Sequence, residues 1–253
     1  MKSITSVPTT HFPYQMNRYI ASLIIFCLLL FAAQGDAVAQ KAVKKHEELN
    51  FSCLYWEGVP AEDLYYRDGK SFHLLEFKNA SRSKSFGLKR AEFFELYREA
   101  VVPVEGMAPY DLLSQTEIPL SRKILFLVIP FEREGGIQYK VIAMDDSLKS
   151  FPPGSFRFAN FCREMLFVRC GEQVEEIPAR EMTVVQPKDS LNGGFVPFMI
   201  GNAKGETLFK TQIYGQPSGR ELVFITPSAK PEGRPRVKFV SQLIVPSVPL
   251  IRE

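Results

Sequence analysis

The sequence is poor in the side chains from which metal centres and nucleophilic active sites are built. Its 253 residues include only three histidines and four cysteines, with no His-x-x-x-His or Cys-x-x-Cys spacing and no Gly-x-Ser-x-Gly turn. A zinc site needs such ligands at spacings that let them meet around one ion. A serine or cysteine nucleophile needs a histidine base, for which only His73 is a candidate. We therefore expect no enzyme activity, no cofactor and no metal site.

Carboxylates are the remaining route to catalysis, since glycoside hydrolysis needs only two of them. Asp145 and Asp146 are adjacent in sequence, so on a strand their side chains would point to opposite faces. They come just before a Phe-Pro-Pro-Gly stretch, which favours a role in turn formation. Calcium binding is the alternative, but the spacing of an oxygen-rich calcium loop is missing.

The sequence also lacks an excess of either charge. Residues 1–39 hold Lys2, Arg18 and Asp36, so the rest of the chain has 29 Lys and Arg against 27 Asp and Glu, a net charge of +2. This near-balance gives no reason to expect nucleic acid or an anionic membrane as a partner.

No apolar run is long enough to span a bilayer. The longest, Tyr19 to Ala33, has fifteen residues, follows Arg18, and leads to Ala37-Val38-Ala39, which is the layout of a secretory signal cleaved after Ala39. We expect a secreted or periplasmic protein with residues 1–39 as its signal peptide, Met16 as an alternative start, and no stable membrane span after cleavage. An uncleaved signal anchor is the alternative.

Three cysteines remain after cleavage, namely Cys53, Cys162 and Cys170. An odd number is not the disulfide framework of small secreted domains. Ser155–Phe161 and Met165–Cys170 suggest a hairpin in which Cys162 lies near the turn and Cys170 at the far end, too far apart for a disulfide. We expect no disulfide and three buried thiols.

Short strands dominate the chain from residue 50 onward, because runs rich in Val, Ile, Phe and Tyr alternate with turn residues. Asp68-Gly69 predicts a tight hairpin turn. The exception is Arg90 to Ala100, whose good helix formers suggest a short helix. The clearest strands are 51–56, 72–77, 124–131, 137–144, 156–161, 166–170, 182–186, 208–214, 222–226 and 237–245.

Phe151-Pro152-Pro153-Gly154 suggests a boundary between two domains, residues 40–150 with a mobile N-terminal tail and residues 151–253. A weak internal repeat pairs Ser71–Phe77 with Ser155–Phe161, and the hairpin 122–141 with 220–239, at unequal offsets. Six or seven strands in each part, without alternating helices, predict an all-β fold of two antiparallel β-sandwiches.

In strand number, and in hairpins of the Phe-Arg-Phe-Ala-Asn-Phe type at Phe156–Phe161, the chain resembles tandem immunoglobulin-like modules of exported bacterial proteins. The resemblance is architectural and implies no activity. The buried cysteine pair of antibody domains is absent.

Aromatic residues are the remaining candidates for ligand binding, because exposed rings bind sugars or proteins. Tyr55-Trp56 and Tyr65-Tyr66 form two pairs, and in each pair one ring should face outward. We therefore expect an exported, non-enzymatic binding or structural module of the cell envelope or the extracellular space, whose partner is a protein of the cell envelope or a glycan. The alternative is a carbohydrate-binding or carbohydrate-active protein that uses these four residues.

The signal sequence generates the first prediction. The chain isolated from its native host should begin at Gln40, since Ala37 and Ala39 form the cleavage site. Amino-terminal sequencing measures this directly. A chain that still begins at Met1 or Met16 would contradict it.

Overall fold

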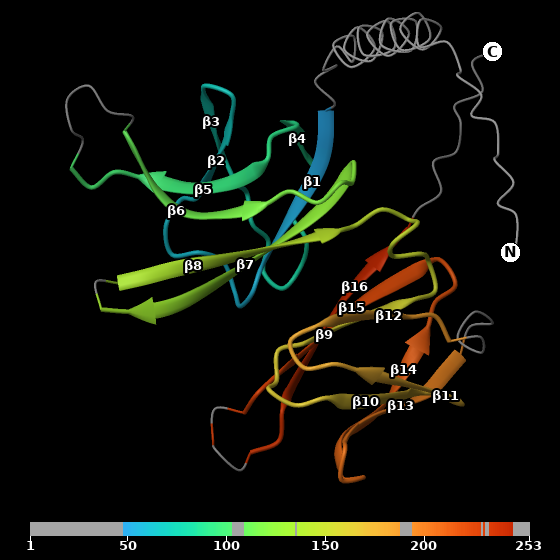
Figure 1. The fold of residues 1–253 in the computed structure, drawn as a ribbon. Helices are drawn as coiled ribbons and strands as arrows, with labels where there is room; N and C mark the ends of the chain where they lie inside the picture. The colour runs from blue at the N-terminus through green and yellow to red at the C-terminus, as the bar shows by residue number, and fades with distance from the viewer. Residues whose placement is uncertain are drawn as a thin grey trace, which may run out of the picture. The chain divides into compact units, whose positions relative to one another are not determined.

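The computed structural model describes residues 48–102, 109–134, 136–187, 194–228, 230 and 233–244. Every regular element in these ranges is a strand (Figure 1), which confirms the all-β prediction. The predicted signal peptide lies outside the described residues. Residues 48–253 cluster as one compact unit.

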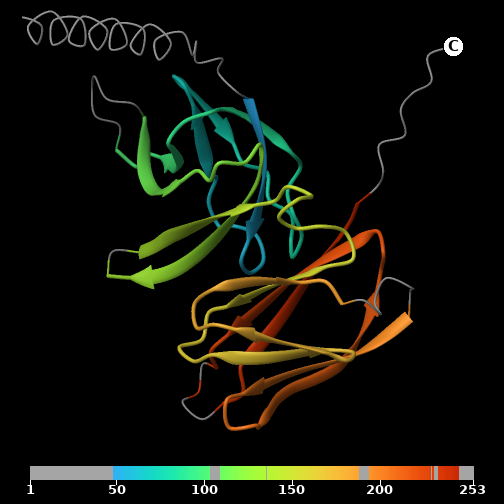
Figure 2. The same ribbon diagram turned by 45° about the vertical axis from the view of Figure 1, so that its right-hand side comes forward.

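The first eight strands form two four-stranded sheets with the orders β4-β1-β7-β8 and β3-β2-β5-β6. All neighbours are antiparallel except β1 and β7, which run parallel from Asn50 beside Lys123 to Tyr55 beside Val128. In Figure 2 the blue strand β1 lies beside the yellow-green strand β7. The strands are β1 (Glu48–Tyr55), β2 (Tyr65–Asp68), β3 (Ser71–Leu74), β4 (Phe86–Lys89), β5 (Phe93–Glu99), β6 (Tyr110–Glu117), β7 (Lys123–Arg133) and β8 (Gly136–Asp145).

The second eight strands repeat this arrangement, with the orders β12-β9-β15-β16 and β11-β10-β13-β14 and a parallel pair between β9 and β15. They are β9 (Phe156–Asn160), β10 (Leu166–Cys170), β11 (Gln173–Ile177), β12 (Met182–Val185), β13 (Gly194–Asn202), β14 (Thr207–Gly215), β15 (Gly219–Thr226) and β16 (Arg236–Leu243). Each strand thus corresponds to the strand eight places earlier. We call β1–β8 the N-terminal sandwich and β9–β16 the C-terminal sandwich.

The shared topology agrees with one of the two matches in the predicted internal repeat and contradicts the other. The match of 122–141 with 220–239 agrees with it, because β7–β8 and β15–β16 are equivalent hairpins. The match of Ser71–Phe77 with Ser155–Phe161 is wrong. It equates β3, at the edge of its sheet, with β9, an inner strand whose counterpart is β1.

Four other predictions need correction. Each sandwich has eight strands instead of six or seven, and the sheets are not wholly antiparallel. The predicted helix at 90–100 is strand β5, which buries Phe94 and Leu96 on one face. The predicted turn at Asp68-Gly69 lies one residue later, because Asp68 still pairs with Ser71 and the left-handed φ of 63° belongs to Gly69.

The hairpin expected between 155–161 and 165–170 is also wrong, because β9 and β10 belong to different sheets. The chain crosses between the sheets at Asn160, which is 1% exposed. Its amide nitrogen donates to the carbonyls of Glu164, Ile177 and Pro178, and its oxygen accepts from the backbone of Cys162. A side chain therefore satisfies the backbone groups that a hairpin ladder would have paired.

Each sandwich has its own core between its two sheets. In the N-terminal sandwich, Phe51 of β1 contacts the rings of Tyr66, Phe94 and Phe126 at 4.9 to 5.4 Å between centroids. In the C-terminal sandwich, Phe158 of β9 stacks on Phe198 of β13. Burial of these rings is the main favourable term in the folding of each part.

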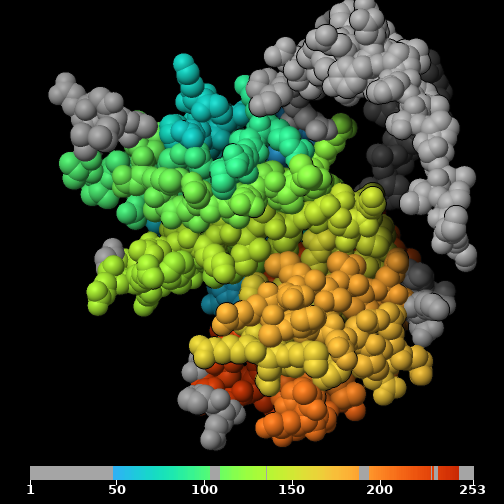
Figure 3. Space-filling view, in the orientation of Figure 1, coloured from blue at the N-terminus to red at the C-terminus, as the bar shows by residue number. Residues whose placement is uncertain are grey.

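A third apolar cluster joins the two sandwiches. The sheets β4-β1-β7-β8 and β12-β9-β15-β16 turn their second faces toward each other. Figure 3 shows the outer surface where the yellow-green part of the N-terminal sandwich adjoins the orange part of the C-terminal sandwich. Consecutive residues of β7 and of β15 are therefore buried on both sides of the strand. The cluster contains Leu54, Leu125, Leu127, Met144, Phe151, Ala159, Leu222, Phe224 and Val240, with Trp56, Ile129, Ile142 and Phe161 packed against it.

A buried ion cluster lies beside this junction. The Asp146 carboxylate is 1% exposed, and its Oδ2 accepts hydrogen bonds from Arg82 Nη1 at 2.7 Å and from Arg220 Nη2 at 2.9 Å. Arg220 Nη1 also donates to the backbone carbonyls of Asp146 and Phe151. The position of Asp146 just before Phe-Pro-Pro-Gly predicts a turn former. In the structure it is the common partner of two guanidinium groups from different sandwiches.

The segment between the sandwiches is held by two arginines. The guanidinium carbons of Arg157 and Arg220 lie 4.5 and 4.8 Å from the centre of the buried Phe151 ring. Arg157 Nη2 also donates to the carbonyl of Ser150. Burial lowers the pKa of both arginines, although the Asp146 carboxylate opposes this effect.

No described strand of one sandwich joins a sheet of the other. The division into two domains, 40–150 and 151–253, stays a prediction. The common apolar cluster and the ion cluster nevertheless make the two sandwiches one compact unit. That either sandwich folds alone stays a prediction.

The cysteines give a second prediction. Cys53, Cys162 and Cys170 are buried with free thiols, and burial raises the pKa of all three, to about 12 for Cys170. Titration with a thiol reagent should therefore find no reactive thiol in the native mature protein and three after denaturation without reductant. One thiol after denaturation would reveal a disulfide.

The ion cluster gives a third prediction. Asp146→Ala should lower the free energy of unfolding by about 3–5 kcal/mol, because it leaves two buried guanidinium groups without their carboxylate. Urea denaturation measures the change. Asp63→Ala, at an exposed loop position, is the control and should change stability by no more than about 0.5 kcal/mol. Equal effects of the two substitutions would contradict the role given to Asp146.

Candidate binding surface

The outer sheet of the N-terminal sandwich, β3-β2-β5-β6, has an aromatic solvent-facing side. Strand alternation puts Tyr66 and Leu96 in the core and their neighbours Tyr65 and Tyr97 on the opposite side. The pairing of β2 with β3 and of β5 with β6 then identifies the residues of β3 and β6 that lie on the same side as Tyr65 and Tyr97. We call the result the aromatic face. It comprises Tyr65, Arg67, Phe72, Leu74, Phe93, Glu95, Tyr97, Glu99, Tyr110 and Leu112.

The rings of this face contact one another in a row. Tyr65 meets Tyr110 edge to face at 5.0 Å, and Tyr110 stacks on Phe72 at 4.2 Å with an interplanar angle of 16°. Phe72 in turn meets Tyr97 edge to face at 5.0 Å. The four rings come from four different strands, so the sheet register fixes their positions.

The polar groups on the face are already paired. Tyr65 donates to Glu99 at 2.8 Å and Tyr97 to Glu95 at 2.9 Å, while Arg67 forms an ion pair with Glu95 at 2.6 Å. The hydrogen bond to Glu99 raises the pKa of Tyr65 to about 12. Burial and then the bond to Glu95 raise the pKa of Tyr97 to about 12. Both hydroxyls therefore stay protonated and donating near neutral pH.

Two exposed leucines add apolar surface to the aromatic face. Leu74, opposite Tyr65, is 45% exposed, and Leu112, opposite Tyr97, is 51% exposed. Phe93 is also exposed. Large apolar side chains beside a row of rings form the kind of patch that marks interaction sites.

The equivalent outer sheet of the C-terminal sandwich has different chemistry. Its β11-β10-β13 side forms an open depression of about 370 Å³ lined mainly by Phe167, Val174 and Met199, with Arg169 and Thr207. Val174 is exposed and lies on β11, the counterpart of β3. The two sandwiches therefore share a topology but not an outer surface.

The four aromatic residues singled out in the sequence do not form one platform. Tyr55 and Tyr66 belong to the core of the N-terminal sandwich. Trp56 lies at the junction, against Phe224 at 5.2 Å and beneath the Lys238 ammonium at 5.3 Å. Of the four, only Tyr65 belongs to the aromatic face.

Sequence reasoning missed Phe72, Tyr97 and Tyr110 for an identifiable reason. Because a helix is predicted for 90–100, Tyr97 is not placed in a sheet and its pairing with Tyr65 is not predicted. The usable signal was the alternation of Phe94 and Leu96 with Glu95 and Tyr97. Tyr110 reaches the same face only through the pairing of β6 with β5.

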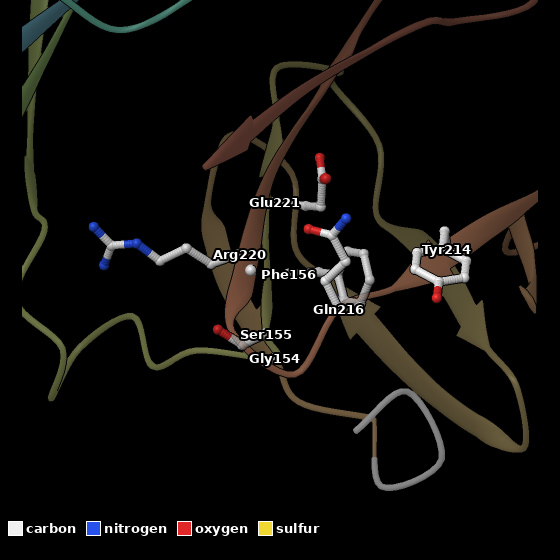
Figure 4. A pocket seen from close by; sticks show the side chains of 8 residues that line it. Gly154, Ser155, Phe156, Tyr214, Gln216, Arg220 and Glu221 are labelled. Carbon is white, nitrogen blue, oxygen red and sulfur yellow. The ribbon is translucent and has the colours of Figure 1, made fainter. Parts of the chain in front are cut away.

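One pocket lies at the start of β15 and is too small for a ligand (Figure 4). It measures about 10 Å³, room for about one water molecule. Glu221 lines it, while the Arg220 side chain extends in another direction, away from Phe156 and Gln216. Burial raises the pKa of Glu221, although a hydrogen bond from Ser241 opposes this.

The other candidate catalytic or metal-binding residues, His73 and Asp145, contact neighbouring side chains and backbone groups of the fold. His73 is exposed on the edge strand β3 and stacks on Tyr66 at 5.2 Å. Asp145 accepts hydrogen bonds from the Ser121 and Ser150 hydroxyls and from the Ser147 backbone. Partial burial alone would raise the pKa of Asp145, but these hydrogen bonds outweigh it and lower the pKa to about 2. Within the described ranges, His, Cys, Asp and Glu do not gather into a group that could hold a metal ion.

Comparison of the chain with protein-family models and with curated protein sequences found no match. Among the residues that the structure describes, no helix is long and apolar enough to cross a membrane.

Proposed function

We propose that this chain is an exported, non-enzymatic binding protein that acts in the cell envelope or the extracellular space and docks a protein partner on the aromatic face. The observation that carries the proposal is the combination of exposed Leu74 and Leu112 with the ring row of Tyr65, Phe72, and Tyr110. Export rests on the signal layout that ends at Ala39.

A protein partner is favoured over a glycan by the state of the polar groups. Sugar recognition needs hydrogen-bonding groups beside an open ring face. Here the Tyr65 and Tyr97 hydroxyls already donate to Glu99 and Glu95, and the Phe72 and Tyr110 faces stack on each other. What the surface offers is apolar area with a charged rim, which is the usual composition of a protein interface.

The immunoglobulin-like tandem belongs to this proposal as well. Two sheets packed over one core support it. Each sandwich has two four-stranded sheets, whereas a constant-type immunoglobulin domain has one sheet of four strands and one of three. The likeness is therefore one of general architecture.

The aromatic face gives a fourth prediction. Residues 40–253, used as bait for chemical cross-linking in envelope fractions of the native host, should capture a protein that is then purified for affinity measurement. The double variant Leu74→Glu and Leu112→Glu should weaken binding about tenfold or more, because it sets charges in an apolar contact. Val174→Glu, at the equivalent outer sheet, is the control and should bind as the unmodified protein does.

Three outcomes would contradict the proposal. The double variant and the control could bind the partner equally well, which would place the contact elsewhere. Residues 40–253 could bind a glycan array in a manner that Phe72→Ala and Tyr110→Ala abolish, which would favour the carbohydrate alternative. A chain retained in the cytoplasm of its host would remove the exported function altogether.

A further inference from the structure

Strand β14 is one edge of the outer sheet β11-β10-β13-β14. Four of the other edge strands, β3, β4, β11 and β12, have only four or five residues. β14 has nine residues, contains no proline and carries a single charged side chain, Lys210. A long edge strand with so little charge is a template on which another strand can pair.

β14 lacks the neighbour that its counterpart has. In the N-terminal sandwich, the equivalent edge strand β6 lies beside β8 of the other sheet. Among the described strands, β14 and β16, which correspond to β6 and β8, do not lie side by side in this way. Side chains bridge them, since Phe209 of β14 meets Phe239 of β16 at 6.2 Å between ring centroids. Phe209 and Ile213 pack against the core and stay partly exposed, so the C-terminal sandwich is open along β14.

The hydrogen bonds of the sheet show which backbone groups of β14 the sheet uses. The N–H of Gly171 donates to the carbonyl of Pro197, so the odd-numbered residues of β13 bond toward β10. Hydrogen-bonding direction alternates along a strand, so the even-numbered residues of β13 bond toward β14. Phe198 is one of them, and its partner is Thr211. The odd-numbered residues of β14 therefore bond back to β13.

The N–H and C=O groups of Lys210, Gln212 and Tyr214 consequently point away from the sheet. They have no backbone partner among the described residues. The Gln212 carbonyl accepts a long bond from the Thr211 hydroxyl at 3.4 Å, and a carbonyl oxygen can accept a second one. The irregularity in the β13–β14 register comes before Phe209, so the stretch from Phe209 to Tyr214 presents a regular edge.

The side chains of this stretch are complementary to themselves. When two copies of β14 pair antiparallel about a two-fold axis at Gln212, Lys210 lies opposite Tyr214 of the second copy. Gln212 lies opposite Gln212 of the second copy, where two amides can hydrogen-bond. The ammonium groups thus face rings instead of each other. An axis at Lys210 would set the two ammonium groups opposite each other, which is unfavourable.

We propose that a second copy of this chain occupies the β14 edge, so that the two four-stranded outer sheets join into one continuous sheet across a two-fold axis at Gln212. Every outward N–H and C=O of Lys210, Gln212 and Tyr214 then has a partner. A second copy fits because the edge is self-complementary, and a closed two-fold pair leaves neither β14 edge free. The interface belongs to the outer sheet of the C-terminal sandwich, so the inference does not rest on the aromatic face.

Sedimentation velocity of residues 40–253 over a range of concentrations tests the proposal. The protein should be monomeric near about 1 μM and dimeric near about 100 μM, because one strand pair is a small interface and binds weakly. Amide hydrogen exchange locates the contact. The N–H groups of Lys210, Gln212 and Tyr214 should exchange several-fold more slowly at the higher concentration, whereas that of Thr211, which bonds β13, should change less.

Two substitutions at Gln212 change the edge while leaving the bonds between β13 and β14 in place. Gln212→Pro removes an outward N–H, which an edge strand tolerates, and Gln212→Glu sets two carboxylates opposite each other. Both should raise the dissociation constant of the dimer about tenfold or more, with the melting temperature of the monomer little changed. Gln138→Glu, at an exposed position on β8, makes the same change of charge and should leave dimerisation unchanged.

A cysteine at the axis tests the register. In a hydrogen-bonded antiparallel pair the two Cα atoms lie about 5.5 Å apart, which suits a disulfide. Gln212→Cys should therefore link the two copies covalently on mild oxidation, and the native cysteines should not interfere because they are buried. Gln138→Cys is the control and should stay unlinked under the same conditions.

Each contrary result overturns the proposal. A monomer at every concentration would assign the β14 edge to another occupant. Oligomers that grow beyond the dimer would contradict a closed two-fold pair. Dimerisation that Gln212→Pro and Gln212→Glu leave unchanged, or that Gln138→Glu weakens equally, would place the interface elsewhere. Equal cross-linking of the two cysteine variants would refute the axis at Gln212.

Discussion

The buried carboxylate of Asp146 is the group on which the arrangement of the two sandwiches depends. Two arginines share its Oδ2, Arg82 from the N-terminal sandwich and Arg220 from the C-terminal one. Charges in such a place are costly unless they are paired and hydrogen-bonded. Arg220 satisfies this condition by also bonding the backbone on both sides of the linking segment. The ion pairs therefore hold the linking segment against both sandwiches at one point. The apolar cluster adds contacts between the two inner sheets beside that point.

This junction decides which surfaces remain for partners. The inner sheets β4-β1-β7-β8 and β12-β9-β15-β16 are covered on both faces, one by their own core and one by each other. Parallel pairs such as β1–β7 and β9–β15 are usual where both faces of a sheet are buried. The second face of each outer sheet lies outside the three apolar clusters of described residues. The two outer sheets have the same strand order but different side chains on their outer faces. Only the outer sheet of the N-terminal sandwich has the row of stacked rings that we call the aromatic face.

Much of the fold was predictable from the sequence, because strand formation depends on local pattern. The apolar runs at 124–131 and 166–170 became strands close to their predicted bounds. The runs from Ile124 to Val128 and from Leu222 to Ile225 also do not alternate with polar residues, which is the signature of a strand buried on both faces. That signature could have predicted the packing of the two sandwiches. The assignment of 90–100 failed because good helix formers outweighed a two-residue alternation in a short segment.

The sequence by itself determined that this chain is built from β-strands and that it has only three histidines and four cysteines, since composition and periodicity are properties of the chain alone. Tertiary structure decided which strands share a sheet, and with that which rings meet: Tyr65, Phe72 and Tyr110 lie on separate strands and become neighbours only through register. It also decided the role of Asp146. Its partners Arg82 and Arg220 are 64 and 74 residues away in sequence, and no local pattern encodes contacts between residues so far apart.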